Sequence, residues 1–546
     1  MLQPADSYET VYRGFRWNIP EYFNIGIDIC DKWSADPERL ALIHEKRDGS
    51  SSRYTFADIR RLSNQAANLF VSRGLRAGDR VGILLPQEPE TAIAHVAAYK
   101  AGAIVVPLFT LFGLDALRYR LRDSGVKLLL TDARSLEKIA QIRVDLPDLD
   151  TVFCIDGSVH GSEAFHAALA SMSQEFLPLR TRADDPALII YTSGTTGPPK
   201  GALHAHRTLL GHLPGVEMSH NFLGLAGDLM WTPADWAWIG GLIDVLLPAW
   251  HHGIPVLAHR FDKFEPEAAF ALMAKHAVRN VFLPPTALKM MRGVPDAQLR
   301  WPLNLRSLAS GGETLGAELL QWGRETFGLT INEFYGQTEC NMVLSSCEAL
   351  FPSRPGSIGK AAPGHEVQII DEAGKILPAG TIGAIAVRRP DPVMFLGYWN
   401  NPQATQEKFI GDWLVTGDTG AKDAHGYVRF VGRNDDVITS AGYRIGPGPI
   451  EDCLLSHRAV RMAAVIGTPD AERTEIVTAF VVLQTGCVPS DQLTRELQDH
   501  VRTRLAAHEY PRQLYYVEAL PMTTTGKIIR RELRDRAMSS PPAQPR

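Results

Sequence analysis

Apolar residues in the first half of the chain form short continuous runs, separated by stretches in which they recur at helical spacing. Four such runs cover residues 79–86, 103–109, 126–132 and 187–193. Continuous Val, Ile and Leu runs are typical of strands buried on both faces, as in a parallel sheet covered by helices. Thr91–Ala101 and Glu265–His276 fit the intervening helices, and runs at 281–285 and 307–313 continue the alternation. The pattern predicts an α/β fold.

The pattern changes near residue 355, where short alternating runs are separated by Gly and Pro. This pattern of short runs and turn residues predicts a β-rich subdomain. After Arg433 a compact unit follows, with strand-like runs at 463–469 and 478–484 and helical spacing at 449–457 and 490–507. We therefore expect a large N-terminal domain over residues 1–432, a hinge over 433–435 and a small α+β C-terminal domain over 436–546.

Composition excludes several classes of protein. The chain has 546 residues, 56 Lys and Arg against 61 Asp and Glu, and a net charge of −5. A dedicated nucleic-acid binder would carry a basic excess, so we expect no nucleic-acid partner. The six cysteines form no C-x-x-C pair, which argues against a disulfide framework or a zinc site and suits a reducing compartment.

The chain shows no segment expected to enter a membrane. Its longest apolar run, 239–250, is interrupted by Asp244 and Pro248 and is too short to cross a bilayer. The first residues are partly acidic and lack the apolar core of a signal peptide. These observations predict a cytoplasmic protein without membrane insertion.

The strongest local signal is a loop rich in Gly, Ser and Thr that follows the run at 187–193. Its candidate phosphate-binding residues are Thr192, Ser193, Gly194, Thr195, Thr196, Gly197 and Lys200. Glycines let backbone N–H groups turn toward an anion, hydroxyls add donors, and lysine adds a positive charge. The loop is not the usual P-loop, because Pro199 precedes the lysine and Gly201 follows it. A flexible surface loop is the alternative interpretation.

This loop resembles the phosphate-binding signature of adenylate-forming enzymes, the superfamily of acyl-CoA synthetases, luciferases and peptide-synthetase adenylation domains. Six further motifs resemble those of the superfamily and follow in its order: 311–313, 333–339, 416–418, 432–438, 442–444 and 521–527. The resemblance extends over nearly the whole chain. It implies a large adenylate-forming domain and a small, mobile C-terminal domain, with ATP, Mg²⁺ and CoA as ligands.

The resemblance also implies roles for single residues. Tyr335 would lie against adenine, Thr338 would contact the α-phosphate, and Glu339 would supply the hard oxygen ligand that Mg²⁺ prefers. Asp418 would bind the ribose, and Arg433 and Arg444 the ribose or α-phosphate. The same motifs add Gly311, Gly312, Glu313, Glu333, Gly336 and Gln337 to the nucleotide site. Taken singly, such residues are equally typical of turns and solvated surfaces.

The small domain would change its role during the reaction. By resemblance, Lys527 bridges the attacking carboxylate and the α-phosphate in the first half-reaction. Asp435 matches the hinge position, and a rotation would then bring Gly442 and Tyr443 to the site beside the pantetheine arm. The candidate residues for the nucleotide end of CoA are Arg473, Arg502, Tyr510 and Arg512. Acetylation of Lys527 by an acetyltransferase, reversed by a deacetylase, would remove the charge that adenylation uses.

Within the superfamily the chain most resembles medium-chain acyl-CoA synthetases, through residues 264–270, 438–452, 468–482 and 509–521. Gly336 stands where acetyl-CoA synthetases typically have Trp, so it could leave room for further carbons, each worth up to ~0.8 kcal/mol when buried. Alternatively Trp236 or Trp238, in the segment that matches the family's acyl pocket, refills that space. That segment departs from the usual pattern, so a short branched or aromatic acid stays open.

The sequence thus predicts an ATP-dependent acyl-CoA synthetase. A short- to medium-chain carboxylate would attack the α-phosphate of ATP to give acyl-AMP and pyrophosphate, and the CoA thiol would then displace AMP. No protein nucleophile is required. The alternatives are a freestanding adenylation enzyme that loads a carrier protein, a luciferase-like oxidase, and a nucleotide sensor, although a sensor would be expected to have lost Lys527 or Glu339.

Overall fold

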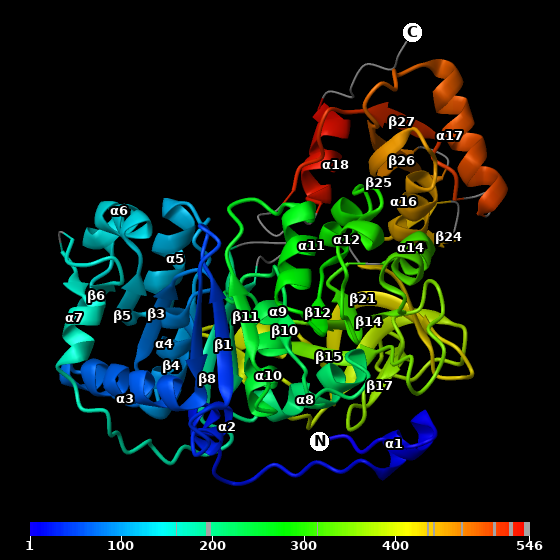
Figure 1. Cartoon of the computed structure of the whole chain (residues 1–546). Coiled ribbons are helices and arrows are strands. Elements are labelled where there is room, and N and C mark those ends of the chain that lie inside the picture. The colour runs from blue at the N-terminus through cyan, green and yellow to red at the C-terminus, as the bar shows by residue number, and fades with distance from the viewer. Residues whose placement is uncertain are drawn as a thin grey trace.

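The computed structural model describes residues 1–159, 161–192, 198–313, 315–433, 436–440, 443–470, 473–505, 509–522 and 528–539. It contains a large N-terminal part, in which two mixed sheets and a smaller β-rich sheet are packed together, and a small C-terminal part (Figure 1). The small part carries a separate sheet and lies above the large part in the view of Figure 1. This arrangement confirms the expected α/β fold with a β-rich subdomain.

The first large sheet has 8 strands in the order β19-β9-β8-β4-β3-β5-β6-β7. Its strands are β3 (Arg80–Leu84), β4 (Ile104–Pro107), β5 (Val126–Thr131), β6 (Thr151–Cys154), β7 (Glu163–Ala164), β8 (Pro186–Thr192), β9 (Lys200–Ala205) and β19 (Gly397–Tyr398). The associated helices are α3 (Phe56–Ser72), α4 (Pro89–Lys100), α5 (Leu114–Ser124), α6 (Ala133–Ile142), η2 (Arg143–Asp145) and α7 (Phe165–Ala170). The predicted runs at 79–86, 103–109 and 126–132 are parallel strands, as expected.

The second large sheet has 9 strands in the order β16-β15-β14-β13-β12-β10-β11-β1-β2. Its strands are β1 (Leu40–Glu45), β2 (Ser51–Thr55), β10 (Met230–Trp231), β11 (Val256–His259), β12 (Asn280–Phe282), β13 (Ser307–Gly311), β14 (Ile331–Gln337), β15 (Cys340–Ser345) and β16 (Lys360–Ala361). The helical elements are α1 (Tyr8–Gly14), α2 (Ile25–Ile29), η1 (Asp31–Trp33), α8 (Thr208–Ser219), α9 (Ile239–Gly241), the π-helical turn η3 (Leu242–Leu246), α10 (Leu247–His251), α11 (Pro266–Lys275), α12 (Pro285–Met291), α13 (Ala297–Arg300) and α14 (Ala317–Phe327).

The third and fourth sheets each have 5 strands. The β-rich sheet contains β17 (Val367–Ile370), β18 (Ile382–Arg388), β20 (Phe409–Ile410), β21 (Trp413–Lys422) and β22 (Val428–Arg433), with α15 (Pro402–Gln406) beside it. The C-terminal sheet contains β23 (Ile438–Ser440), β24 (Tyr443–Ile445), β25 (Val460–Asp470), β26 (Thr474–Leu483) and β27 (Gln513–Tyr516), with α16 (Pro447–Leu455), α17 (Asp491–Arg504) and α18 (Arg530–Ser539). One sheet therefore ends at Arg433 and the next begins at Ile438.

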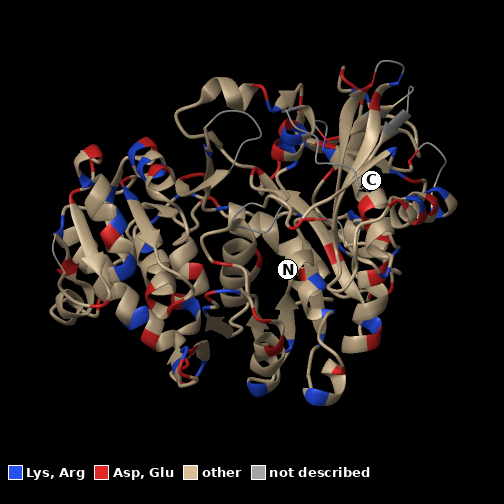
Figure 2. Cartoon of the chain, turned by 90° about the horizontal axis from the view of Figure 1, so that it is seen from above, with Lys and Arg blue, Asp and Glu red and all other residues tan. Residues whose placement is uncertain are grey.

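The main hydrophobic core lies between the two large sheets. It joins Val81 and Val105 of the first sheet to Leu42 and Val256 of the second, and helices α4 and α8 contribute to it. Burial on both faces explains why these strands read as continuous apolar runs. Within the described ranges, no helix is long and apolar enough to cross a membrane. Basic and acidic residues are interspersed along the chain in Figure 2, in keeping with the nearly balanced composition.

A buried lysine links α4 to two neighbouring elements. The Lys100 ammonium is completely buried, lies 2.6 Å from Asp31 Oδ1, and donates hydrogen bonds to Ser63 Oγ and Asn64 Oδ1 at 3.0 and 2.8 Å. A buried ammonium is tolerated only when paired and hydrogen-bonded in this way. Removing it leaves three polar partners facing each other without their donor.

We expect Lys100→Met to destabilise the large domain by about 3–5 kcal/mol, because it breaks a buried ion pair. Lys32→Met is the matched control, because the Lys32–Asp28 pair is exposed to solvent and should be worth about 1 kcal/mol or less. Thermal unfolding midpoints of the two variants and the wild type provide the measurement. Equal midpoints for both variants would contradict a stabilising role for Lys100.

Candidate active site

The sequence motifs meet where parallel strands of the second sheet end. Gly311 is the last residue of β13 and Gln337 the last residue of β14, and these strands run parallel. In open α/β sheets, ligands bind in the crevice beyond the carboxyl ends of the strands. The motifs at 311–313 and 333–339 therefore occupy the edge at which a ligand site is expected.

Tyr335, Asp418 and Arg433 are brought together from three strands. The Tyr335 hydroxyl donates a hydrogen bond to Asp418 Oδ2 at 2.6 Å, and Asp418 is paired with Arg433 across β21 and β22. Burial and the neighbouring Asp418 carboxylate raise the pKa of Tyr335 well above its ordinary value, so the hydroxyl stays a donor. The cluster offers a buried aromatic ring beside a half-buried carboxylate and an exposed guanidinium.

Gln337 is held by a lysine that the sequence reasoning missed. The Gln337 amide donates to the Thr416 carbonyl at 2.9 Å, and the Lys408 ammonium donates to Gln337 Oε1 at 2.9 Å. These contacts fasten the end of β14 to β21, next to the 416–418 motif. No local pattern around Lys408 distinguishes it from a surface lysine.

Glu339 and Lys200 converge on a second residue that sequence reasoning missed, Tyr398. The Tyr398 hydroxyl donates to Glu339 Oε1, and the Lys200 ammonium lies 5.3 Å from the centre of the Tyr398 ring. Tyr398 is placed there because β19 pairs with β9, which begins at Lys200. The Glu339 side chain is buried, and Thr338 beside it is half-buried. A carboxylate and an ammonium thus face one region.

The 311–313 turn requires its glycines. A Cβ on Gly311 would lie 2.6 Å from the Phe334 ring, and Gly312 has a φ of +94°, which side chains rarely tolerate. The Glu333 carboxylate accepts a hydrogen bond from the Leu315 N–H, two residues after this turn, at 3.3 Å. Burial raises the pKa of Glu333 to about 8, which the Leu315 hydrogen bond opposes. Glu333 thus contacts the segment that directly follows the 311–313 turn.

Gly336 does not open a pocket by lacking a side chain. A Cβ at this position would lie 2.3 Å from Met342 N and 2.5 Å from the Asn341 Cα. The following strand folds back onto Gly336, so its backbone fills the space that a side chain would take. The interpretation of Gly336 as room for a longer acid is therefore wrong, and the refilling residues are Asn341 and Met342 rather than the tryptophans.

The two tryptophans of the acyl segment have different surroundings. Trp236 is fully buried in the main core, and its Nε1 has no hydrogen-bond partner in the described part of the chain. Trp238 is half-buried, and its ring centre lies 5.5 Å from that of Phe109 and 5.8 Å from that of Phe112. Since Phe109 and Phe112 follow β4, Trp238 packs against the segment that leaves the first sheet after β4.

The candidate CoA residues form one cluster and one separate position. The guanidinium carbons of Arg502 and Arg512 lie 5.7 and 5.1 Å from the centre of the Tyr510 ring. Arg473 immediately precedes β26, the return strand of the β25–β26 hairpin, and its N–H donates to Asp470 Oδ1 at 2.9 Å. Arg502 and Arg512 are therefore two exposed cations beside one aromatic ring. Arg473 lies apart from them, next to the turn between β25 and β26.

Several predicted residues lie outside the described structure. These are Ser193, Gly194, Thr195, Thr196, Gly197, Asp435, Gly442 and Lys527. Thr192 ends β8 and Lys200 begins β9, so the described strands flank the phosphate-binding candidate loop. Tyr443 and Arg444 belong to β24, but their side chains are not described.

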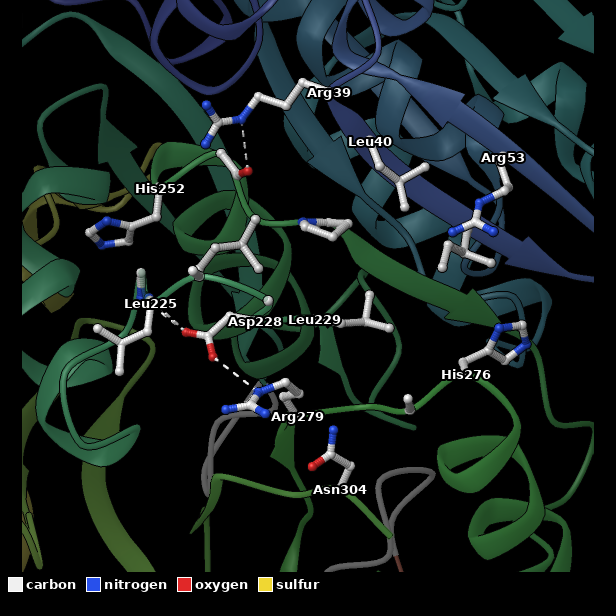
Figure 3. Close-up of a pocket in the computed structure, with 18 residues that line it drawn as sticks. Arg39, Leu40, Arg53, Leu225, Asp228, Leu229, His252, His276, Arg279 and Asn304 are labelled. Atoms are coloured by element: carbon white, nitrogen blue, oxygen red, sulfur yellow. Dashed lines mark hydrogen bonds and ion pairs between the residues drawn. The ribbon is translucent and has the colours of Figure 1, made fainter. Parts of the chain in front are cut away.

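A cavity of about 610 Å³ lies at the opposite, amino-terminal edge of the second sheet (Figure 3). Figure 3 shows Arg39, Arg53 and Arg279 on different sides of it. Arg39 donates to the Gly253 carbonyl at 3.1 Å, just beyond the end of α10, and Asp228 is paired with Arg306. Of the lining arginines, Arg39 thus contacts a carbonyl beyond the helix end and Arg279 lies 4.0 Å from the Asp228 carboxylate, and none of the described motif residues lines this cavity.

Comparison with known proteins agrees with this geometry. Residues 31–399 match the family described as AMP-binding enzyme, and residues 449–527 match the AMP-binding enzyme C-terminal domain. The human mitochondrial acyl-coenzyme A synthetase ACSM4 is 36% identical over 534 residues, which cover 95% of this chain and 91% of that protein.

Solved structures give the same result. An anthranilate CoA ligase, AuaEII, in complex with anthranoyl-AMP has a TM-score of 0.88 at 30% identity, covering 95% of this chain and 98% of that one. An acyl-CoA synthetase from Brucella canis has a TM-score of 0.76 at 34% identity, covering 98% and 99%. With its motifs gathered at one sheet edge and matches over both parts, the chain belongs to the AMP-binding family of adenylate-forming enzymes.

Proposed function

We propose that this protein is an ATP-dependent acyl-CoA synthetase that forms an acyl-AMP intermediate and releases AMP and pyrophosphate. The observation that carries the proposal is the convergence of Tyr335, Asp418 and Arg433 beside the Glu339–Tyr398–Lys200 group, in a chain of this family. The similarity to acyl-coenzyme A synthetases favours CoA over a carrier protein as the acceptor.

In the first half-reaction, a carboxylate oxygen of the acid attacks the α-phosphorus of ATP and the bond to pyrophosphate breaks. The Tyr335 ring would lie against the adenine ring, and the Asp418 carboxylate would accept hydrogen bonds from ribose hydroxyls. Lys200, with the adjoining loop, and Thr338 would contact phosphate oxygens. Positioned cations and hydroxyls lower the repulsion between two anions in such a displacement.

Glu339 would hold Mg²⁺ together with the phosphates of ATP. Among the described residues there is no group of three His, Cys, Asp or Glu side chains that could hold a metal ion by itself. Mg²⁺ in ATP-binding sites is typically held by one or two carboxylates plus phosphate oxygens, so a single buried carboxylate fits it. The ion would neutralise phosphate charge.

The small domain would rotate about residues 433–435. On the large-domain side, Arg433 ends β22. On the other side, Asp436 lies 2.5 Å from Arg534 and 3.7 Å from Arg530, both in α18. Each side of the hinge is thus fixed to a different domain, which concentrates rotation in the residues between them.

In the described orientation, α18 faces the nucleotide motifs. Arg530, its first residue, is close enough to Glu313 to interact electrostatically, although the two residues belong to different domains. We infer from this contact between α18 and the 311–313 motif that the described orientation is the one used for adenylation. After rotation, Gly442 and Tyr443 would meet pantetheine, with Arg473 and the Arg502–Tyr510–Arg512 cluster near the nucleotide end of CoA. The CoA sulfur would then attack the acyl carbonyl carbon and expel AMP.

The acid would be short- to medium-chain, branched or aromatic. Trp238 with Phe109 and Phe112 supplies an aromatic wall between the sheets, and a structurally similar enzyme is named an anthranilate CoA ligase. A cytoplasmic location and reversible acetylation of Lys527 complete the proposal. Acetylation would remove the positive charge of Lys527 and should therefore resemble its removal by mutation.

A panel of carboxylates from C2 to C12, with branched and aromatic acids, tests the reaction. We expect AMP release that depends on both the acid and CoA, with the matching acyl-CoA as product. Acid-dependent pyrophosphate exchange without turnover on CoA would instead indicate a carrier-protein acceptor. AMP formation without any thioester under all conditions would contradict the proposal.

Lys527→Ala should separate the half-reactions. We expect it to lose most acyl-AMP formation, because the positive charge between two anions is gone, and to retain conversion of supplied acyl-AMP to acyl-CoA. Pyrophosphate exchange and thioester formation measure the two steps independently. Equal losses in both would refute the role assigned to Lys527.

Gly446→Ala should weaken the described domain orientation. A Cβ at Gly446, in the small domain, would lie 1.8 Å from the Val431 carbonyl oxygen in β22 of the large domain. We expect slower acyl-AMP formation and a spared thioester step. Gly14→Ala is the control, since a Cβ at that position would meet no atom within 4 Å. A loss confined to the thioester step would show that this orientation serves the second half-reaction.

A further inference from the structure

Next to the candidate active site, a carboxyl group is buried without a charged partner among the described residues. Asp244 lies in the π-helical turn η3, six residues after Trp238, and its side chain is almost fully buried. Its Oδ1 accepts a hydrogen bond from Asn341 Nδ2 at 2.6 Å. Asn341 is the residue that fills the space beside Gly336, between Tyr335 and Gln337. Asn341 therefore connects the Asp244 carboxyl group to the 333–339 motif.

The second oxygen of this carboxyl group has no partner among the residues that the structure describes. In the described part of the chain no hydrogen bond or ion pair reaches Asp244 Oδ2. A Cβ added to Gly240 would lie 3.8 Å from Oδ2 and 3.0 Å from the Phe282 ring. The Phe282 ring centre is in turn 5.2 Å from that of Phe334. Oδ2 thus lies near Gly240, whose other close neighbour is the Phe282 ring at the carboxyl end of β12.

This arrangement is costly for folding. Burial raises the pKa of Asp244 well above its ordinary value, and the Asn341 hydrogen bond offsets this only in part. Burying a carboxyl group that has one hydrogen bond and no charged partner costs stability, whereas a leucine would bury only apolar atoms in this turn. Polar groups that cost stability are characteristic of functional sites, and π-helical turns occur frequently there.

We propose that Asp244 determines substrate specificity by accepting a hydrogen bond from an amino or hydroxyl group on the acyl part of the acid. Such a donor favours the ionised carboxylate, which burial alone disfavours. The inference rests on the proposed function. The acid would enter between the sheets past Trp238, with its carboxylate toward the nucleotide and its donor group toward Oδ2. The neighbouring Phe282 and Phe334 would enclose the intervening carbons.

Matched pairs of acids that differ only in the donor test this inference. Suitable pairs are 4-aminobutyrate with pentanoate, 2-aminobenzoate with 2-methylbenzoate, and 3-hydroxybenzoate with 3-methylbenzoate. For at least one pair, we expect wild-type kcat/KM to favour the donor-bearing acid roughly ten- to hundredfold, the effect of leaving a buried acceptor unpaired in the other complex.

Variants at position 244 identify the responsible group. Asp244→Asn keeps an acceptor for Asn341 and nearly the same shape, and we expect it to shrink the preference. Asp244→Leu should reverse the preference toward the methyl acid and leave the thermal midpoint equal or higher. Asp499→Asn, on the exposed face of α17, is the control and should change neither quantity.

The outcomes separate this inference from the proposed function. An unchanged preference in folded Asp244→Asn and Asp244→Leu enzymes would overturn the role of Asp244 and leave acyl-CoA synthesis standing. Efficient wild-type turnover of only the methyl acids would do the same. Absence of CoA-dependent AMP release with every acid would overturn the proposed function and, with it, this inference.

Discussion

The hydrogen bond between Tyr335 and Asp418 is the contact on which the proposed nucleotide site depends. It joins β14 of the second large sheet to β21 of the β-rich sheet at 2.6 Å, and the Gln337–Thr416 hydrogen bond reinforces it. Since hydrogen bonds to a charged acceptor strengthen as water is excluded, this partly buried contact holds the aromatic ring beside the carboxylate. These two hydrogen bonds hold two sheets, built from distant segments of the chain, in a fixed position relative to each other, as a single nucleotide-binding site would need.

Strands and turns could be predicted from the sequence because their cause is local. Strands buried on both faces must be continuously apolar, which is why the runs at 79–86 and 126–132 are found as β3 and β5. The motifs at 311–313 and 333–339 end strands, so identifying the strands also positioned them. The local sequence pattern was sufficient to predict those elements whose structure depends on residues adjacent in the chain.

Residues whose partners are distant in sequence could not be predicted in this way. Tyr398 binds Glu339 across 59 positions, Lys408 binds Gln337 across 71, and Asp244 binds Asn341 across 97. Gly336 shows a different limit, because a missing side chain can indicate open space or close approach of another backbone. The sequence pattern is the same in both cases, and only the fold of β15 onto β14 distinguishes them.

The contact between the domains is built so that it can be broken. Asp452 of α16 points at Gly316, just beyond the 311–313 turn, where a Cβ would lie 3.0 Å from its carboxylate. Burial raises the pKa of Asp452 to about 7, Lys289 opposes this, and Glu451 and Glu318 add to it. An interface that buries a carboxyl group gains little net stability, because desolvation offsets the contacts it forms. Such an interface would suit the proposed rotation, because little net stability is lost when the small domain leaves it.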